Sequence, residues 1–215
     1  SWSGGKDSAL ALDALSRDPA VEVLGLLTSV TSGYDRISVH GVRRSMLRAQ
    51  VERLGLPLFE ITLDPGCTND AYEAAFHAAL GQIRAELGQV THIAFGDLFL
   101  EDVRTYRERL LAGTGFDPLF PIWGQDTTSV ARRFIAEGFS ARLVCVDTTQ
   151  LPADFAGREF NEKLLVDLPQ SVDPCGERGE FHTFVSDGPP FSAAIPYIIG
   201  EKVLRDGRFM FCDIQ

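Results

Sequence analysis

The sequence predicts an α/β protein built on a doubly wound parallel sheet, followed by a small C-terminal α+β extension. Strand-like apolar runs alternate with helix-length segments over the first two-thirds of the chain, and this alternation ends after Asp147. Alternation of this kind produces a parallel sheet that helices cover on both faces. We therefore expect one domain over residues 1–147 and an extension over residues 148–215.

The expected elements follow one another in a regular order. After a Gly-Gly loop, Ala9–Leu15 is a strong helix-forming run, and the apolar run 21–28 is typical of a strand buried on both faces. Apolar spacing and stop signals predict further helices over 42–54, 69–87, 100–111 and 127–137. Further strands are predicted at 57–63, 92–95, 119–123 and 141–146, and in the extension at 195–199 and 208–212.

The composition narrows the class of partner. Acidic residues (30) outnumber basic residues (20), which gives a formal net charge of −10. Because nucleic-acid affinity depends largely on Lys and Arg, this balance argues against a nucleic-acid partner. No apolar run reaches the roughly 18 to 20 residues that span a bilayer, so no membrane partner is expected either.

The cysteines and the first residues indicate the setting of the protein. The four cysteines are scattered and form no Cys-x-x-Cys pair. We therefore expect reduced thiols in the cytoplasm, and neither a disulfide framework nor a zinc site. The chain begins with Ser1 just before a glycine-rich loop, and we expect further residues upstream, including most of a first strand. The sequence leaves a homo-oligomer open.

The segment Ser3-Gly4-Gly5-Lys6-Asp7-Ser8 has the features of a phosphate-binding loop. Two glycines let the backbone approach a ligand closely, and the following helix directs free N–H groups and a positive dipole end toward it. The lysine adds a full charge, and the serine hydroxyls can donate to phosphate oxygens. The spacing differs from that of the nucleotide-kinase and dinucleotide-binding loops. A capped glycine turn would explain Gly-Gly alone, but the whole hexapeptide favours phosphate.

A second unusual stretch, Asp173–Phe184, combines one proline, two glycines, two glutamates and a histidine. Its proline and glycines predict a turn that leads into a strand. Strand alternation then places Glu180 and His182 on one face, about 7 Å apart, close enough to share one ligand. Taken alone, the stretch is explained equally well by a hairpin with solvated glutamates.

Both segments resemble motifs of known enzymes. The hexapeptide 3–8 is similar to the signature of the N-type ATP pyrophosphatases, in the adenine nucleotide alpha-hydrolase-like superfamily. The segment Cys175-Gly176-Glu177-Arg178-Gly179-Glu180-Phe181-His182-Thr183 resembles the Cys-Gly-Glu-Asn-Gly-Glu-[Tyr/Phe]-His-Thr motif of the diphthine–ammonia ligase family. The resemblance covers essentially the whole chain, with Arg178 in place of the commoner Asn. It is greatest to compact, bacterial-type members, and since bacteria make no diphthamide, the resemblance does not identify the substrate.

The resemblance implies an ATP-dependent ligase that forms an amide. ATP would adenylate the carboxylate of a small molecule or a protein and release pyrophosphate, and ammonia or an amine would then displace AMP. The cofactors implied are ATP and Mg²⁺, with Asp7 as a ligand of the metal ion. The expected catalytic residues are Lys6, Asp7, Glu180 and His182. The expected ATP-binding residues are Ser3, Gly4, Gly5, Lys6, Asp7, Ser8, Gly96 and Asp97. The expected substrate-binding residues are Cys175, Gly176, Glu177, Gly179, Glu180, His182 and Thr183.

Several weaker signals have two interpretations. Asp97 ends a predicted parallel strand, at the edge of the sheet where ligands bind, but it could instead cap the next helix. His40 opens a predicted helix and could face the ligand, although a solvated helix start explains it slightly better. Cys175 lacks a nearby base apart from His182, which argues against a nucleophilic thiol.

Two other functions stay open at the level of sequence. A transfer-RNA-modifying enzyme of the same superfamily would share the loop, but the acidic balance and the lack of paired cysteines count against it. A nucleotide-binding sensor without turnover would share the fold. Sensors of that kind usually lack the intact Ser-Gly-Gly-Lys-Asp-Ser loop, which favours an enzyme.

Overall fold

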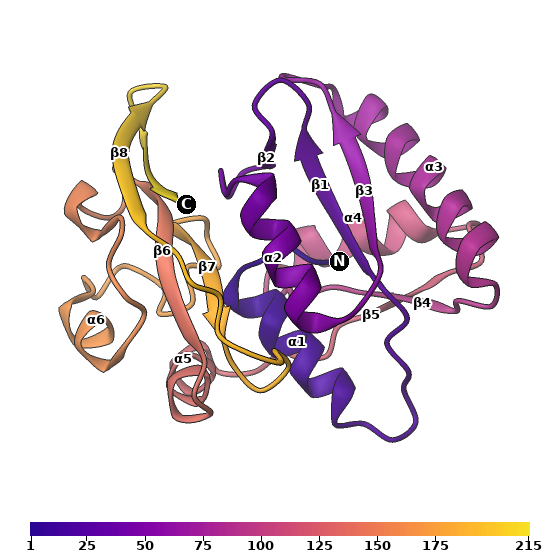
Figure 1. Ribbon diagram of the computed structural model, residues 1–215, viewed down its shortest axis with the longest axis horizontal. Helices are drawn as coiled ribbons and strands as arrows, with labels where there is room; N and C mark the ends of the chain where they lie inside the picture. Colours follow the sequence, from indigo (N-terminus) through magenta and orange to yellow (C-terminus); the bar gives the residue numbers. More distant parts are fainter.

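The computed structural model describes residues 1–215, which form six α-helices, nine strands and one 3-10 turn (Figure 1). The helices are α1 (Lys6–Ser16), α2 (Arg44–Leu54), α3 (Asn69–Leu87), α4 (Glu101–Leu111), α5 (Thr127–Ala136) and α6 (Glu162–Asp167), and the 3-10 turn is Ala153–Phe155. The strands are β1 (Leu26–Thr31), β2 (Arg36–Ile37), β3 (Leu58–Leu63), β4 (His92–Ala94), β5 (Asp117–Leu119), β6 (Ser140–Asp147), β7 (Phe181–Asp187), β8 (Ile199–Arg205) and β9 (Phe209–Ile214).

The N-terminal half contains the expected parallel strands. β1 pairs in parallel with β3, and β4 pairs in parallel with β5, while the short β2 is antiparallel to β1. The first residues connect the two parallel pairs. The Trp2 N–H donates to the Leu27 carbonyl at 2.7 Å, and the Ser1 amino group donates to the Ala94 carbonyl at 2.5 Å. Parallel strands of this kind present their carboxyl ends at one edge, where ligands bind.

Helices cover both faces of this parallel part. Leu26 and Val30 of β1 belong to one apolar cluster together with Leu10 of α1 and Leu47 of α2. Leu27 belongs to a second cluster, built with residues of α3 and α4. Because successive strand residues point to opposite faces, the sheet is packed on both sides. The predicted fold class is confirmed.

The C-terminal part is a four-stranded antiparallel sheet in the order β7-β6-β9-β8. The expectation that the strand at 141–146 continues the parallel alternation is wrong, because β6 pairs antiparallel with β7 and β9. β6 lies on the other side of α1 and α2 from β1 and β3 (Figure 1). An apolar run does not specify its partner strand or its direction. The division of the chain at residue 147 stays a prediction.

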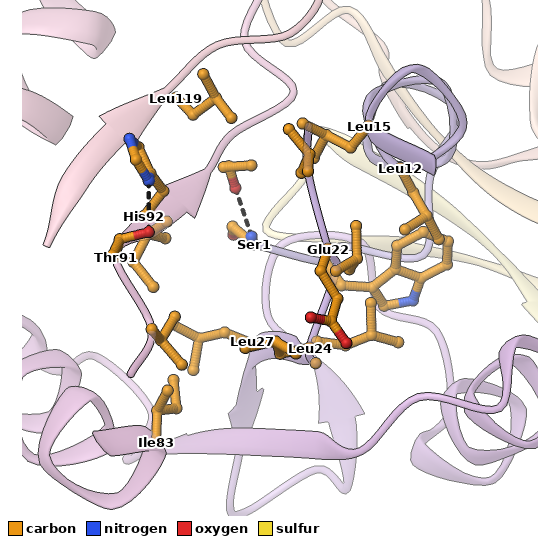
Figure 2. Close-up of a pocket in the computed structure, with 18 of the residues that line it drawn as sticks. Ser1, Leu12, Leu15, Glu22, Leu24, Leu27, Ile83, Thr91, His92 and Leu119 are labelled. Carbon is orange, nitrogen blue, oxygen red and sulfur yellow. Dashed lines mark hydrogen bonds between the residues drawn. The ribbon is translucent and has the colours of Figure 1, made fainter. Parts of the chain in front are cut away.

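Some expected strands are displaced. Only the end of the run 21–28 is a strand, since β1 begins at Leu26. Val21 and Leu24 instead line an apolar cavity of about 450 Å³ beside Ser1, between β1 and β4 (Figure 2). Their apolar character therefore reflects this cavity and not a sheet. Two other strands are also shifted along the chain. A strand is predicted over 119–123, but β5 ends at residue 119. Another is predicted over 195–199, but β8 begins at residue 199.

The helices and the thiols have two further properties. None of the helices is both long enough and apolar enough to cross a membrane. All four cysteines are free thiols.

Candidate active site

The phosphate-type loop lies directly before α1, as the sequence predicts. Gly4 has φ 76°, and Gly5 is the extended residue before the helix and provides no side-chain cap. A Cβ at Gly4 would lie 2.6 Å from the Gln50 side-chain oxygen, and a Cβ at Gly5 would lie 3.1 Å from the Thr183 carbonyl. Glycine is therefore required at position 4, for its backbone conformation as well as for space, while a side chain at position 5 would be crowded.

Gln50 of α2 holds this loop, and the sequence analysis did not single it out. Its side chain is fully buried and donates to the carbonyls of Gly4 (2.9 Å) and Val185 (2.7 Å), while it accepts from the Trp2 indole N–H at 3.1 Å. A signal was present in the sequence. Gln50 follows Met46 by four residues and so lies on the apolar face of the helix, where a polar side chain needs partners.

The C-terminal motif lies against the loop, although the two are far apart in sequence. The Val185 N–H donates to the Gly4 carbonyl at 2.9 Å, and the Lys6 N–H donates to Thr183 Oγ1 at 3.0 Å. The Lys6 ammonium also donates to the Cys175 carbonyl oxygen. The motif thus folds back over the start of α1, as the resemblance implies by assigning both segments to one site. One consequence is that Thr183 already occupies the first N–H of the helix.

A polar cavity of about 460 Å³ opens between the loop, the ends of β1 and β4, and the C-terminal motif. It is lined by eleven of the residues that the sequence predicts for the site: Ser3, Lys6, Asp7, Ser8, Gly96, Asp97, Gly176, Glu177, Gly179, His182 and Thr183. It is also lined by His40, one of the weaker signals, and by polar or charged residues that the sequence does not predict: Thr28, Ser29, Ser38, Tyr72 and Arg107. Four predicted residues do not line it: Gly4, Gly5, Cys175 and Glu180.

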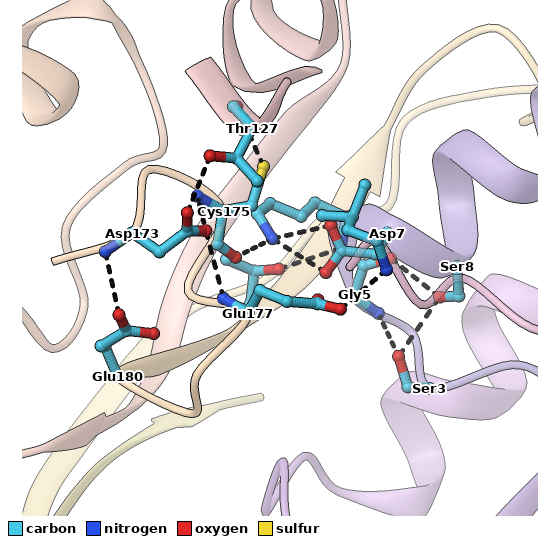
Figure 3. A network of polar contacts seen from close by, with 12 residues as sticks. Ser3, Gly5, Asp7, Ser8, Thr127, Asp173, Cys175, Glu177 and Glu180 are labelled. Atoms are coloured by element: carbon cyan, nitrogen blue, oxygen red, sulfur yellow. Dashed lines mark hydrogen bonds and ion pairs between the residues drawn. The ribbon is translucent and has the colours of Figure 1, made fainter. Parts of the chain in front are cut away.

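Lys6 is buried at the base of this cavity and is already paired. Its Nζ lies 2.8 Å from both carboxylate oxygens of Asp7 (Figure 3). Burial is the largest single effect and lowers the pKa of Lys6, but the charge and hydrogen bond of Asp7, together with Cys175 and Glu177, outweigh it, so the pKa is raised and the side chain stays a cation. A phosphate that reached Lys6 would therefore compete with Asp7 and with the Cys175 carbonyl.

The side chains at the cavity do not form a metal site by themselves. No group of three or more His, Cys, Asp or Glu side chains in the structure is arranged to hold a metal ion. Both oxygens of Asp7 accept hydrogen bonds from Lys6, so the expected Asp7 ligand is not free. Magnesium in phosphate sites is usually held by one or two carboxylates plus the phosphates of the substrate. The residues present do not fit a preformed Mg²⁺ centre, and no proposed step depends on one.

Glu180 does not face the cavity, which corrects its predicted catalytic and substrate-binding roles. Its carboxylate is fully buried and accepts from the backbone N–H of Asp173 at 2.9 Å (Figure 3). It also accepts from the backbone N–H of Arg178 at 2.9 Å. The strand begins only at Phe181, so the alternation that placed Glu180 beside His182 does not extend to it. Glu180 closes the turn that carries the rest of the motif.

We therefore expect Glu180→Ala to destabilise the protein by about 3 kcal/mol, because two buried donors lose a charged acceptor. Urea denaturation measures this loss, and the exposed Glu159→Ala serves as a matched control with little expected change. Unchanged stability of Glu180→Ala would contradict the role of Glu180 in the turn.

Cys175 is also directed away from the cavity. Its Sγ donates to the Thr127 carbonyl at 3.3 Å, and burial raises the pKa of its thiol to about 12. A thiol of this kind is almost entirely protonated near pH 7 and is a poor nucleophile. Only its backbone carbonyl, which contacts Lys6, touches the site.

Glu177 is the carboxylate that the motif does place in the cavity. It accepts from the Leu98 N–H at 2.7 Å, which links the turn to the end of β4. Burial raises the pKa of Glu177 to about 7, and the nearby charges of Asp7 and Asp97 add to the effect. A carboxyl group that titrates near pH 7 in a ligand cavity is suited to general base catalysis.

Two histidines form part of the wall of the cavity. The ring centroids of His40 and His182 lie 4.5 Å apart, with an interplanar angle of 36°. Burial lowers the pKa of His40 to about 4 and that of His182 well below its usual value, so both rings are neutral near pH 7. Of the two interpretations of His40, the one that faces the ligand cleft is correct.

Three buried polar atoms have no hydrogen-bond partner in the structure, and all three belong to residues that line this cavity. They are Thr28 Oγ1, Asp97 Oδ2 and Arg107 Nε. Arg107 Nε lies 3.5 Å from Asp97 Oδ2, close enough for an ion pair but without a hydrogen bond. Buried polar groups are nearly always satisfied, so unsatisfied donors and acceptors around one cavity indicate a polar ligand.

We expect Thr28→Val to make the free protein more stable and to weaken ligand binding. Because the hydroxyl is buried without a partner, its removal should stabilise the free protein by about 1 kcal/mol. The same change should weaken ATP binding about tenfold, as titration calorimetry measures, which is about 1.4 kcal/mol. Thr114→Val is the matched control, since its hydroxyl donates to the Leu111 carbonyl outside the cavity, and it should lose stability and keep ATP affinity. Wild-type ATP affinity in Thr28→Val would contradict the inference that the ligand contacts the Thr28 hydroxyl.

Comparisons with known proteins agree with this arrangement. The family models described as diphthamide synthase N-terminal domain and diphthamide synthase C-terminal domain match residues 1–118 and 126–214. Among curated proteins, the diphthine–ammonia ligase of Danio rerio is 24% identical, over 94% of this chain and 87% of its own. That of Homo sapiens is 24% identical over 94% and 83%, and that of Rattus norvegicus is 25% identical over 72% and 62%. One matched domain supplies the loop and the other supplies the motif, and the chain belongs to the diphthamide synthase family.

Proposed function

We propose that the protein is an ATP-dependent carbon–nitrogen ligase, which adenylates a carboxylate and converts it to an amide. The observation that carries the proposal is the single cavity shared by the loop and the motif, whose lining includes the three residues that carry unsatisfied buried polar atoms. The relatives named diphthine–ammonia ligase support the same reaction class. The setting we propose is the cytoplasm, with the four thiols reduced.

In the proposed first step, a carboxylate oxygen of the acid attacks the α-phosphorus of ATP. The bond between that phosphorus and the bridging oxygen breaks, and pyrophosphate leaves with the electron pair. Lys6 would offset the charge that develops on the pyrophosphate, after exchanging its contact with the Cys175 carbonyl for a phosphate oxygen. Electrostatic stabilisation of this type usually accelerates such transfers more than any other single effect. Mg²⁺ would enter with the phosphates of ATP.

In the proposed second step, the nitrogen of ammonia or an amine attacks the acyl carbon. The bond from that carbon to the AMP oxygen breaks, AMP leaves, and the nitrogen loses one proton as the amide forms. Glu177 would accept this proton, and its position in the lining of the cavity and its pKa of about 7 support this role. His182, neutral in the same wall, would position the acyl group.

Isotope transfer tests the carboxylate step. An acid with both carboxylate oxygens replaced by oxygen-18 should pass one of them to AMP, and phosphorus NMR detects the label as a shifted AMP signal. Candidate acids, free and peptide-linked, are compared with ammonium present. AMP that forms only in their presence but carries no label would refute adenylation of the carboxylate.

A further inference from the structure

His40 lies where the phosphate-type loop, β7 and the cavity meet. Its Nδ1 is 3.3 Å from the Thr183 carbonyl oxygen, and its ring packs against that of His182 in a tilted arrangement. Its Cε1 would be only 3.0 Å from a Cβ at Gly5. Thr183 in turn accepts from the Lys6 N–H. A side chain from the segment between β2 and α2 therefore contacts the loop and the C-terminal motif at once.

A strained turn fixes His40 in this position. The His40 N–H donates to the Ser38 carbonyl at 2.8 Å and closes a three-residue turn around Val39, whose φ is 67°. A β-branched residue rarely adopts this conformation, and turns of this kind are strained. Backbone strain of this size persists where the surrounding structure imposes it, and it clusters at functional sites. On the other side of His40, Gly41 lies close against the Phe211 ring, since a Cβ at Gly41 would be 2.6 Å from that ring.

We propose that His40 is a positioning residue that aligns the His182–Thr183 wall with the phosphate-type loop. The inference rests on the proposed ligase function, which requires the nucleotide and the acid substrate to be held in one fixed relation. Because the ring is neutral, its single N–H must be on Nδ1 to donate to the Thr183 carbonyl. Misplacement of reacting groups by about 1 Å can cost about 100-fold in rate, so His40 should affect turnover far more than ATP binding.

The kinetic test compares three variants of the full chain by their rates of AMP formation. His40→Ala should lower the maximal rate about 100-fold, with the KM for ATP within about threefold of wild type. His40→Asn, whose amide N–H can replace the Nδ1 donor, should recover at least tenfold of that loss. His77→Ala is the matched control, because His77 also contacts a backbone carbonyl, that of Leu110 at 2.8 Å, but outside the cavity. Equal rates for His40→Ala and His77→Ala would overturn the proposal.

Hydrogen exchange tests the alignment independently of turnover. The Lys6 and Val185 amides join the loop to β7, and both should exchange at least tenfold faster in His40→Ala than in His77→Ala. If wild-type protein forms no AMP, the ligase proposal fails and the exchange rates alone decide the role of His40. Unchanged exchange of both amides would overturn that role even in an active enzyme.

Discussion

The double variant Lys6→Met/Asp7→Asn should remain folded and form AMP at least about 100-fold more slowly than wild type, since removal of one oxyanion-stabilising donor costs 10²–10³ in rate. Lys6 is the buried cation at the base of the cavity, and its main partner is Asp7. Replacing both residues avoids an unpaired buried charge. By contrast, Lys6→Met alone leaves that carboxylate without its cation and should cost about 3 kcal/mol of stability.

Rates of AMP formation and urea denaturation together measure these effects. The control is Lys163→Met, which removes an exposed lysine that pairs with Asp167 on α6 and should leave both quantities close to wild type, because Asp167 keeps its ion pair with Arg158. A Lys6→Met/Asp7→Asn protein with wild-type turnover would show that Lys6 does not act on the phosphates.

Glu177→Gln should lower amide formation about 100-fold at pH 8, in the range expected for loss of a general base. The base must be deprotonated to accept a proton, so the wild-type rate should rise with pH through about 7, the pKa of Glu177. Glutamine does not titrate, so at a constant concentration of free ammonia this rise should disappear in the variant. A pH profile of the rate from 5.5 to about 8.5 tests both expectations.

The stabilities of wild type and Glu177→Gln should diverge with pH, and the variant should become the more stable protein as the pH rises. Burial raises the pKa of Glu177 from 4.5 to about 7, so the folded protein holds this proton more tightly than the unfolded chain. Glu177 therefore opposes folding increasingly as the pH rises between these values, and Glu177→Gln should gain stability relative to wild type over that window. The exposed Glu108→Gln on α4 is the control for both measurements. A Glu177→Gln variant that keeps the wild-type rate and pH profile would exclude Glu177 as the base.

The parts of the site that the sequence predicts well are those encoded locally. Glycines before a helix-forming run specify a tight turn and an anion-binding helix end, and Lys6 adds the charge. The structure places this loop where the pattern predicts it. It also places Glu177 and His182 in the same cavity. Only the family resemblance predicts that the C-terminal motif lies beside the loop, because no local rule brings together residues about 170 positions apart.

The parts that the sequence does not predict depend on long-range packing. The strand β6 has an ordinary apolar pattern, and only its neighbours β7 and β9 make it antiparallel. Glu177 and Glu180 are chemically identical and three residues apart, yet the turn between them directs one into the cavity and the other into backbone hydrogen bonds. His40 depends on the conformation of the turn at Val39, for which a valine gives no sequence signal.

The identity of the ATP-derived products tests the central claim most directly. Phosphorus NMR of wild-type protein with ATP, Mg²⁺, ammonium and candidate acids should show AMP and pyrophosphate appearing in equal amounts as the first products. The same mixture with Lys6→Met/Asp7→Asn should show neither above background. ADP and orthophosphate as the primary products of the wild-type protein would contradict the proposed cleavage between the α- and β-phosphates.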